Sequence, residues 1–446
     1  MTGERPGRAA GPLGILACAG PLPIEVAEAS RRNGRAVHIV AIDGFAADEV
    51  TRYPHERVSL GEVGRMIASF RRACVSEIVI AGAMQRPDLL KLKIDRGFVR
   101  HLPTVLALTR GGDDSVLRRI VRFFESQGFA VAGVGDVAPD LLAPNGQLGA
   151  KAANADEHVA LRRGADLIAA LAPFDIGQGV VATSNGIVAV EGARGTDAML
   201  RDLGPGGVAA GAAAGAVLVK LAKPGQEMRI DLPTVGAETV RKAAEARLAG
   251  IGVGAGGAIV LERARMIADA DSAGLFLIGL AAGDADAGRV AADASPVEPP
   301  SPLTVAARRA PTPSDRTDIA IGRRLLGVLA EHGAGRACIV AREHVLAVSG
   351  RLPLAAWVEA QGRPTSWGRR TFRRRLGVLV IEGRNNLGDD AAADAVLDAP
   401  LFRAAMGSGL AGLVFLGLLP DGERRAAIVA WANEAKMFLM TGEAPA

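Results

Sequence analysis

The chain has 446 residues and a mass of 45.8 kDa, a length that predicts two to four domains of ordinary size. Apolar residues make up 49% and charged residues 22%, which is typical of a soluble globular protein. The 52 basic and 48 acidic residues give a net charge of +4 and are interspersed, so no basic block indicates a nucleic-acid partner. Three widely spaced cysteines, Cys18, Cys74 and Cys338, exclude a disulfide scaffold and a cysteine-based zinc site and fit a reducing cytoplasm.

Neither the N-terminus nor the longest uncharged run predicts a segment that crosses a membrane. Residues 1–12 contain two arginines but no apolar stretch like that of a signal peptide. Residues 203–219 are uncharged but rich in Gly and Ala, whereas a spanning helix needs roughly twenty strongly apolar residues. We therefore expect any membrane contact to be peripheral.

Residues 13–150 alternate short apolar runs with amphipathic stretches of helical length. Expected strands and helices follow one another at residues 14–19 (strand), 24–33 (helix), 37–42 (strand), 77–81 (strand), 115–126 (helix) and 129–134 (strand). This alternation predicts an α/β fold with an open parallel, Rossmann-like sheet, in which ligands bind at the carboxyl ends of strands. The first turn lacks GxGxxG, and Gly20-Pro21 is more typical of a plain strand–helix turn than of a phosphate cradle.

Two further regions follow, separated by a segment of different composition. Residues 156–283 are rich in Gly and Ala and are expected to form a second α/β domain. Residues 284–313 are dominated by Ala, Asp, Pro and Ser and are expected to form a linker. Residues 314–446 form the third region.

The third region repeats the second. Shifting the sequence by 158 positions aligns residues 156–192 with residues 314–350 without a gap, and glycine and apolar positions keep recurring to the end of both regions. We interpret this as a duplicated domain. Two unrelated Ala/Gly-rich domains are the alternative.

The polar residues differ between the two copies. Glu191, Thr196 and Asp197 of the first copy are aligned with Ser349, Leu354 and Ala355 of the second. The second copy also lacks a Lys-Pro-x-Gln-Glu segment, and Asp398 is aligned with Asp231. Polar groups that only supported the fold would be needed in both copies, so their loss suggests that they carry chemistry in the first; incidental surface drift is the alternative.

A dense polar run lies in the first copy, on a stretch expected to be strand and loop. Its members are cationic, amide and acidic side chains: Lys220, Lys223, Gln226, Glu227, Arg229 and Asp231. Two lysines and an arginine suit a phosphate ester or diphosphate, and a carboxylate among them can orient water, accept its proton or hold Mg²⁺. An exposed salt-bridged loop is the alternative.

Residues 223–236, KPGQEMRIDLPTVG, resemble the hallmark motif of the UDP-2,3-diacylglucosamine pyrophosphatases of the LpxI type, which act in lipid A biosynthesis. Other motifs agree with this family: IGQG (176–179), EG (191–192), GTDAML (195–200), RPD (86–88) and GDD (112–114). The resemblance covers residues 13–283. The sequence departs from the family's glycine-rich first turn, which is Ala17-Cys18-Ala19-Gly20 here, and from its Gly-Asn-x-x-Arg-Pro run at residues 82–87.

The resemblance implies an N-terminal α/β domain, a catalytic domain at residues 156–283 and a site between them. It implies Mg²⁺-dependent hydrolysis of the diphosphate of UDP-2,3-diacylglucosamine to UMP and 2,3-diacylglucosamine 1-phosphate (lipid X), by a cytoplasmic enzyme peripheral to the inner membrane. Asp231, Gln226 and Arg229 would be catalytic, with Asp231 also the candidate metal ligand. The substrate-binding candidates are Gly20, Pro21, Arg86, Asp113, Asp114, Thr196, Asp197, Lys220 and Lys223.

Two other functions remain open: a non-catalytic protein that binds a nucleotide sugar or lipid, and a hydrolase of another nucleotide-linked lipid. For the third region we expect a degenerate, inactive copy that either pairs with the catalytic domain in place of a second subunit or docks on lipid or a partner. The chain itself is expected to form a homodimer or to use this internal pairing.

Overall fold

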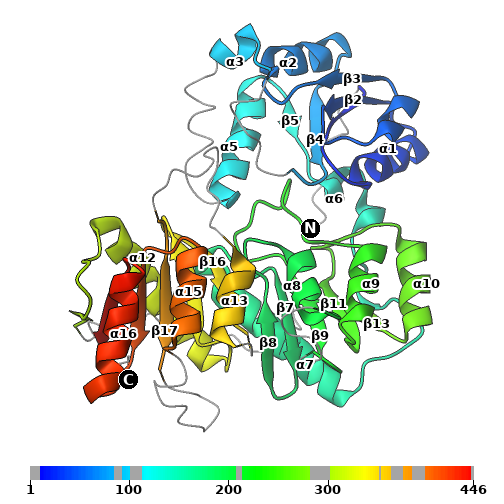
Figure 1. The fold of residues 1–446 in the computed structure, drawn as a ribbon. Helices are drawn as coiled ribbons and strands as arrows, with labels where there is room; N and C mark the ends of the chain where they lie inside the picture. The colour runs from blue at the N-terminus through cyan, green and yellow to red at the C-terminus, as the bar shows by residue number, and fades with distance from the viewer. Residues whose placement is uncertain are drawn as a thin grey trace, which may run out of the picture.

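The computed structural model describes residues 11–84, 93–100, 113–206, 213–281, 302–350, 353–362, 375–383 and 397–442, without the side chains of residues 113–115. These residues form three α/β domains, each built on its own sheet (Figure 1). We refer to them as the N-terminal, middle and third domains.

The N-terminal domain is a parallel five-stranded sheet of order β3-β2-β1-β4-β5. Its elements are β1 (Leu13–Ala17), α1 (Leu22–Arg32), β2 (Val37–Ile42), β3 (His55–Val58), α2 (Val63–Arg72), β4 (Glu77–Ala81), α3 (Arg96–Arg100), α5 (Asp113–Ser126), β5 (Ala130–Val131) and α6 (Val134–Val137). Alternate residues of β1 enter different cores: Ile15 packs on the α1 side, and Leu16 packs on the α2 and α5 side. Both faces of the sheet are therefore covered, which explains the continuous apolar runs and confirms the predicted open parallel α/β fold.

The strand expected at residues 129–134 is wrong in its extent. Only Ala130–Val131 pairs with β4, and Val134 already belongs to α6. The Asp136 side chain ends the strand, because its Oδ2 accepts a 2.9 Å hydrogen bond from the Gly133 amide and so begins the helix.

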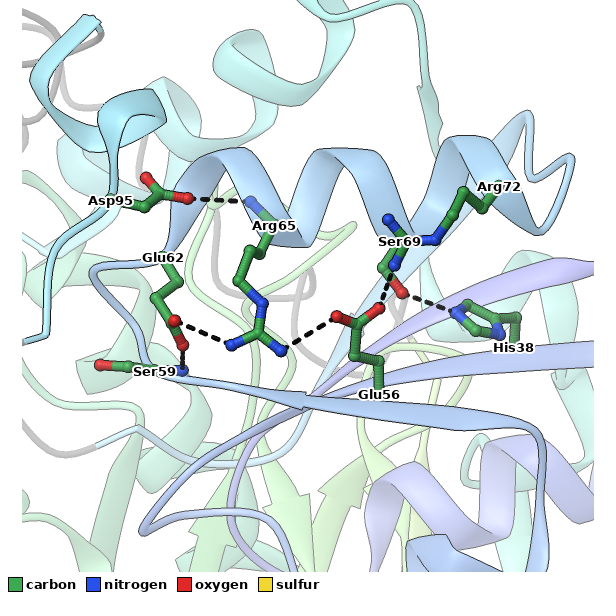
Figure 2. Close-up of polar contacts among 8 residues, drawn as sticks. All are labelled: His38, Glu56, Ser59, Glu62, Arg65, Ser69, Arg72 and Asp95. Atoms are coloured by element: carbon green, nitrogen blue, oxygen red, sulfur yellow. Dashed lines mark hydrogen bonds and ion pairs between the residues drawn. The ribbon is translucent and has the colours of Figure 1, made fainter.

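Polar side chains tie α2 to β3 and to the start of α3 (Figure 2). Arg65 bonds Glu62 and Glu56, at 2.8 and 3.1 Å, and Glu56 also accepts from Arg72. Asp95 accepts the Arg65 amide at 2.9 Å, which holds α3 against the N-terminus of α2. This network is internal to the N-terminal domain and has a structural role.

The middle domain contains a mixed six-stranded sheet of order β6-β13-β11-β9-β7-β8. Its elements are β6 (Gly146–Gln147), α7 (Ala155–Leu171), β7 (Gly179–Thr183), β8 (Gly186–Val190), α8 (Thr196–Leu203), β9 (Val217–Lys220), β10 (Thr234–Val235), α9 (Ala237–Glu245), β11 (Gly250–Gly254), β12 (Ile259–Val260), α10 (Arg263–Ala273) and β13 (Phe276–Leu280). Because β6 pairs with β13, the domain begins before residue 150, which corrects the expected boundary.

The third domain contains a six-stranded sheet of order β14-β19-β18-β17-β15-β16. Its elements are β14 (Thr304–Val305), α12 (Pro313–Glu331), β15 (Ala337–Ala341), β16 (His344–Val348), α13 (Leu354–Gln361), β17 (Val378–Glu382), α15 (Ala399–Gly407), β18 (Gly412–Leu416), α16 (Gly422–Glu434) and β19 (Phe438–Gly442). The predicted linker extended too far, since β14 lies within residues 284–313 and pairs with β19. Residues 282–301 of that linker lie outside the described residues.

The two six-stranded sheets have the same strand order and the same pattern of parallel and antiparallel pairs. Even an irregularity is shared: the pairing of β7 with β8 shifts between Val181 and Ala182, and that of β15 with β16 shifts between Ile339 and Val340, 158 residues later. Each element of the middle sheet thus has one counterpart in the third domain.

Of the helices in the described parts of the chain, none combines the length and the hydropathy that crossing a membrane requires.

Candidate active site

The loop after β9, residues 221–233, carries the three predicted catalytic residues and Lys223, and it lies between the N-terminal and middle domains. Arg118 of α5 donates to the Gly225 carbonyl oxygen at 2.7 Å. Ile230 packs against the core of the N-terminal domain on the α5 side, and Leu232 packs against the core on the α1 side. Apolar contacts and a cross-domain hydrogen bond therefore hold the polar residues of this loop at the domain junction (Figure 1).

Asp231 is held by two glutamines. Gln226 donates from Nε2 to the Asp231 carbonyl oxygen at 2.5 Å, and Gln178 donates to Asp231 Oδ2 at 3.4 Å. Gln226 also accepts the Lys223 amide at 2.9 Å. Both ends of the Gln226 amide are thus used inside the loop, so Gln226 positions Asp231 and Lys223.

Lys220 and Thr196 meet where β9 ends and α8 begins. Lys220 Nζ donates to Thr196 Oγ1 at 2.7 Å, and Thr196 is 5% exposed. The preceding Gly195 has a φ of 79°, which glycine adopts without strain and which turns the chain into the helix. The arrangement combines an ammonium group with the N-terminus of a helix, two features that favour phosphoryl oxygens.

The other predicted cations are paired with carboxylates. Lys223 Nζ lies 2.6 Å from Asp175 Oδ1. Arg229 binds Glu227 with two nitrogens, at 2.8 and 2.9 Å, and reaches Glu125 of α5 at 2.8 Å. The hydrogen bond from Arg229 lowers the pKa of Glu227, and its bonds with the two glutamates raise the pKa of Arg229. Arg229 therefore links the loop to the N-terminal domain, and its action on a diphosphate stays a prediction.

Asp197 points to a different neighbour. Its Oδ2 lies 2.8 Å from Lys242 Nζ of α9. This ion pair joins the first turn of α8 to α9, so Asp197 supports the helix that presents Thr196.

Glu191 belongs at this site, although it is absent from the predicted site residues. Its amide donates to the Gly179 carbonyl oxygen at 2.8 Å, and its Oε2 is buried with no hydrogen-bond partner in the described parts of the chain. A Cβ placed on Gly179 would come within 2.5 Å of Oε2, so the carboxylate lies directly over the start of β7, where Gly179 is paired with Lys220. The signal for this residue was its replacement by serine in the second copy.

The site residues predicted in the N-terminal domain are described only in part. Gly20, with a φ of 90°, and Pro21 form the turn between β1 and α1, and a Cβ placed on Gly20 meets no atom within 4 Å. The free space is therefore at Gly20 itself, whereas Ala19 just before it pairs with Ala83 after β4. Arg86 lies outside the described residues, as do the side chains of Asp113 and Asp114 at the start of α5.

No group of three or more His, Cys, Asp or Glu side chains within the described ranges is arranged to hold a metal ion. Mg²⁺ is commonly bound through one or two carboxylates together with water and substrate phosphates. Asp231, and the carboxylate of Glu191 with its unpartnered oxygen, fit that mode of binding but do not form an all-protein cage.

The strand pairings locate the counterparts of these residues in the third domain. Lys220 pairs with Gly179, and Ile381 pairs with Ala337, 158 residues after Gly179. The amides of Leu221 and Glu382 donate to the carbonyl oxygens of Gln178 and Arg336 respectively. The residues Gln178, Glu191, Thr196 and Lys220 are thus replaced by Arg336, Ser349, Leu354 and Ile381.

Asp398 is not the counterpart of Asp231, which corrects the sequence alignment. α9 and α15 have nine residues each, and their N-cap residues are Gly236 and Asp398. Asp398 Oδ1 accepts the Leu401 amide at 2.8 Å, an ordinary helix cap.

Comparisons with known proteins divide the chain as the structure does, into an N-terminal and a middle domain. Residues 12–141 match the family model described as the LpxI N-terminal domain, and residues 144–278 match the LpxI C-terminal domain. The UDP-2,3-diacylglucosamine pyrophosphatase LpxI of Caulobacter vibrioides is 38% identical over 272 residues, which cover 60% of this chain and 97% of the relative. These matches coincide with the N-terminal and middle domains.

Proposed function

Because the chain belongs to the LpxI family, we propose that it hydrolyses the diphosphate of UDP-2,3-diacylglucosamine to UMP and 2,3-diacylglucosamine 1-phosphate. The observation that carries this proposal is the environment of Asp231. Its carboxylate is oriented by Gln178 and its backbone by Gln226, on a loop that follows Lys220 and lies against the N-terminal domain.

The residues of this site would have different roles in the hydrolysis. Lys220, with Thr196 and the N-terminus of α8, would neutralise phosphoryl oxygens as negative charge develops on them. Asp231 would orient the attacking water and accept its proton while a new P–O bond forms and the bridging P–O bond breaks. The negative charge of the leaving phosphate would be balanced by Lys220.

Mg²⁺ belongs to the same proposal. When bound, it would neutralise the diphosphate charge that otherwise repels the attacking oxygen. Asp231 would hold it, and Glu191 is the second carboxylate of the site with an oxygen to offer. The lipid-linked substrate further implies a cytoplasmic enzyme in peripheral contact with the inner membrane.

The test is UMP release from UDP-2,3-diacylglucosamine by the wild-type chain and by Asp231→Asn. Removing a catalytic carboxylate should lower the rate by roughly 10² to 10⁴ while the fold and substrate binding persist. Asp398→Asn is the matched control, since this aspartate caps a helix in the third domain. Near-normal release by Asp231→Asn would defeat the assignment. Binding without turnover by the wild type would favour a non-catalytic protein, and turnover of another nucleotide-linked lipid would change the substrate.

A further inference from the structure

The third domain packs against the middle domain along the outer strand of each sheet. β8 and β16 are the terminal strands of their sheets, and they lie side by side (Figure 1). The Ala193 amide donates to the Leu346 carbonyl oxygen at 2.8 Å, which joins the segment after β8 to β16. Behind them, α7 packs on α12, and one apolar core contains side chains from both domains, among them Leu167 and Leu325.

The contacts across this junction are reciprocal. A Cβ placed on Gly192 would lie 2.7 Å from the Leu346 carbonyl oxygen. A Cβ placed on Gly350, the counterpart of Gly192, would lie 2.2 Å from the carbonyl oxygen of Val188, the counterpart of Leu346. Gly192 contacts Leu346, and their counterparts Gly350 and Val188 contact each other. Reciprocal contacts of this kind show that the interface has twofold symmetry.

Ten of the fifteen residues that line a pocket at the junction are related by this symmetry. Its lining includes five pairs of residues separated by 158 positions: Ala189 and Ala347, Val190 and Val348, Gly192 and Gly350, Met199 and Trp357, and Leu203 and Gln361. The local twofold axis therefore passes through this pocket, between α8 and α13.

We infer that the third domain is an inert copy of the catalytic domain that occupies, within one chain, the place of a second catalytic domain in a twofold dimer. An isologous interface is closed, so the β8 edge is already covered and the chain should be a monomer. The third domain cannot act as a second site, because Ser349, Leu354 and Ile381 replace the carboxylate, the hydroxyl and the ammonium group of the catalytic copy.

The interface also contacts the segment of the middle domain that carries Glu191 and Thr196. Gly192 and Ala193, which touch the third domain, lie between Glu191 and Thr196 in the sequence. The third domain thus holds, next to Glu191, the segment that connects the carboxylate to the hydroxyl bound by Lys220. This positioning role rests on the proposed function, whereas the pairing itself does not.

Light scattering and hydrogen–deuterium exchange of the full chain test the pairing. We expect a mass of 45.8 kDa and protection of β8 and β16 that does not depend on protein concentration. A dimer, or protection that fails on dilution, would overturn the inference.

Substitution at the axis tests the reciprocity. Gly350→Ala should weaken the contact with Val188, and we expect loss of protection in residues 186–193 as well as in residues 344–350. Gly192→Ala should give the same two-sided loss. Gly407→Ala is the matched control, because a Cβ there meets no atom within 4 Å and we expect wild-type exchange. Loss confined to the substituted domain in both variants would contradict a shared twofold interface.

UMP release separates the positioning role from the pairing. Gly350→Ala should lower turnover on the order of tenfold to a hundredfold, since small displacements of catalytic groups are costly. Normal turnover with two-sided loss of protection would reject the positioning role alone. If the wild-type chain has no activity, the proposed function fails, and the exchange data still decide the pairing.

Discussion

A buried carboxylate oxygen without a hydrogen-bond partner costs free energy of folding, about 1–3 kcal/mol and more when the group is charged. Glu191 carries such an oxygen, and its counterpart Ser349 instead accepts the Ala337 amide at 2.9 Å. We therefore expect Glu191→Ser to lower kcat for UMP release by roughly 10- to 100-fold while the melting temperature stays equal or rises. The experiment pairs turnover with calorimetry. A fall in melting temperature at unchanged kcat would make Glu191 a structural residue.

The Glu227–Arg229 pair predicts a pH dependence. The Arg229 hydrogen bond lowers the pKa of Glu227 in the folded chain, so the pair contributes stability above the unfolded pKa of about 4.3 and loses it as pH falls through the folded value. Glu227→Gln should thus lower the melting temperature at pH 7, and the difference from wild type should shrink toward pH 3. A difference that grows on acidification would contradict this assignment.

Metal removal tests the proposed role of Asp231. EDTA should abolish UMP release by the wild-type chain, and added Mg²⁺ should restore it, because the diphosphate charge must be neutralised before attack. Asp231→Asn should need more Mg²⁺ to reach its own, lower maximum. Full turnover in EDTA would exclude a metal requirement.

At the scale of whole elements, Asp398 caps α15 and has no catalytic counterpart. Asp398→Ala should destabilise the third domain by about 0.5–2 kcal/mol, the usual cost of a lost N-cap, and leave turnover unchanged. Denaturant unfolding followed by tryptophan fluorescence measures the first effect. Loss of activity as complete as in Asp231→Asn would show that the third domain is not inert.

Strands that are buried on both faces of the sheet could be predicted from the sequence. β2 and β4 have the expected bounds, because buried parallel strands are continuous apolar runs. β5, at the edge of its sheet, is only two residues long. It pairs with a neighbour on one side only, so the helix cap that follows it determines where the strand ends. β3, the other edge strand, is a half-buried polar segment and was not predicted.

The site was predictable as a motif but not as a set of contacts. The polar run placed Asp231 and Lys220 in one region, yet Arg229 binds Glu125, which is 104 residues away in sequence. The shift of 158 positions that aligns the start of the two regions also does not give the counterpart of Lys220, because strand pairing makes that counterpart Ile381. Register depends on pairing across strands, which apolar periodicity alone does not determine.

At the scale of the whole molecule, we expect the core shared by the middle and third domains to couple their unfolding. Leu325 of α12 is fully buried in that core, which also contains side chains of α7 and β7. Leu325→Ala should cost about 2–5 kcal/mol, as buried leucine truncations do. Because the core belongs to both domains, this loss should appear in the middle domain as well.

The chain offers separate probes for the two domains. All three tryptophans, Trp357, Trp367 and Trp431, belong to the third region of the sequence, and Trp357 lines the pocket at the junction, so fluorescence reports on the third domain and its interface. Thermal loss of UMP release reports on the proposed catalytic site in the middle domain. In the wild type the two transitions should coincide, and in Leu325→Ala both should move to lower temperature by the same amount. Two transitions that separate, with only the fluorescence change shifted by Leu325→Ala, would show that the domains unfold independently despite their common core.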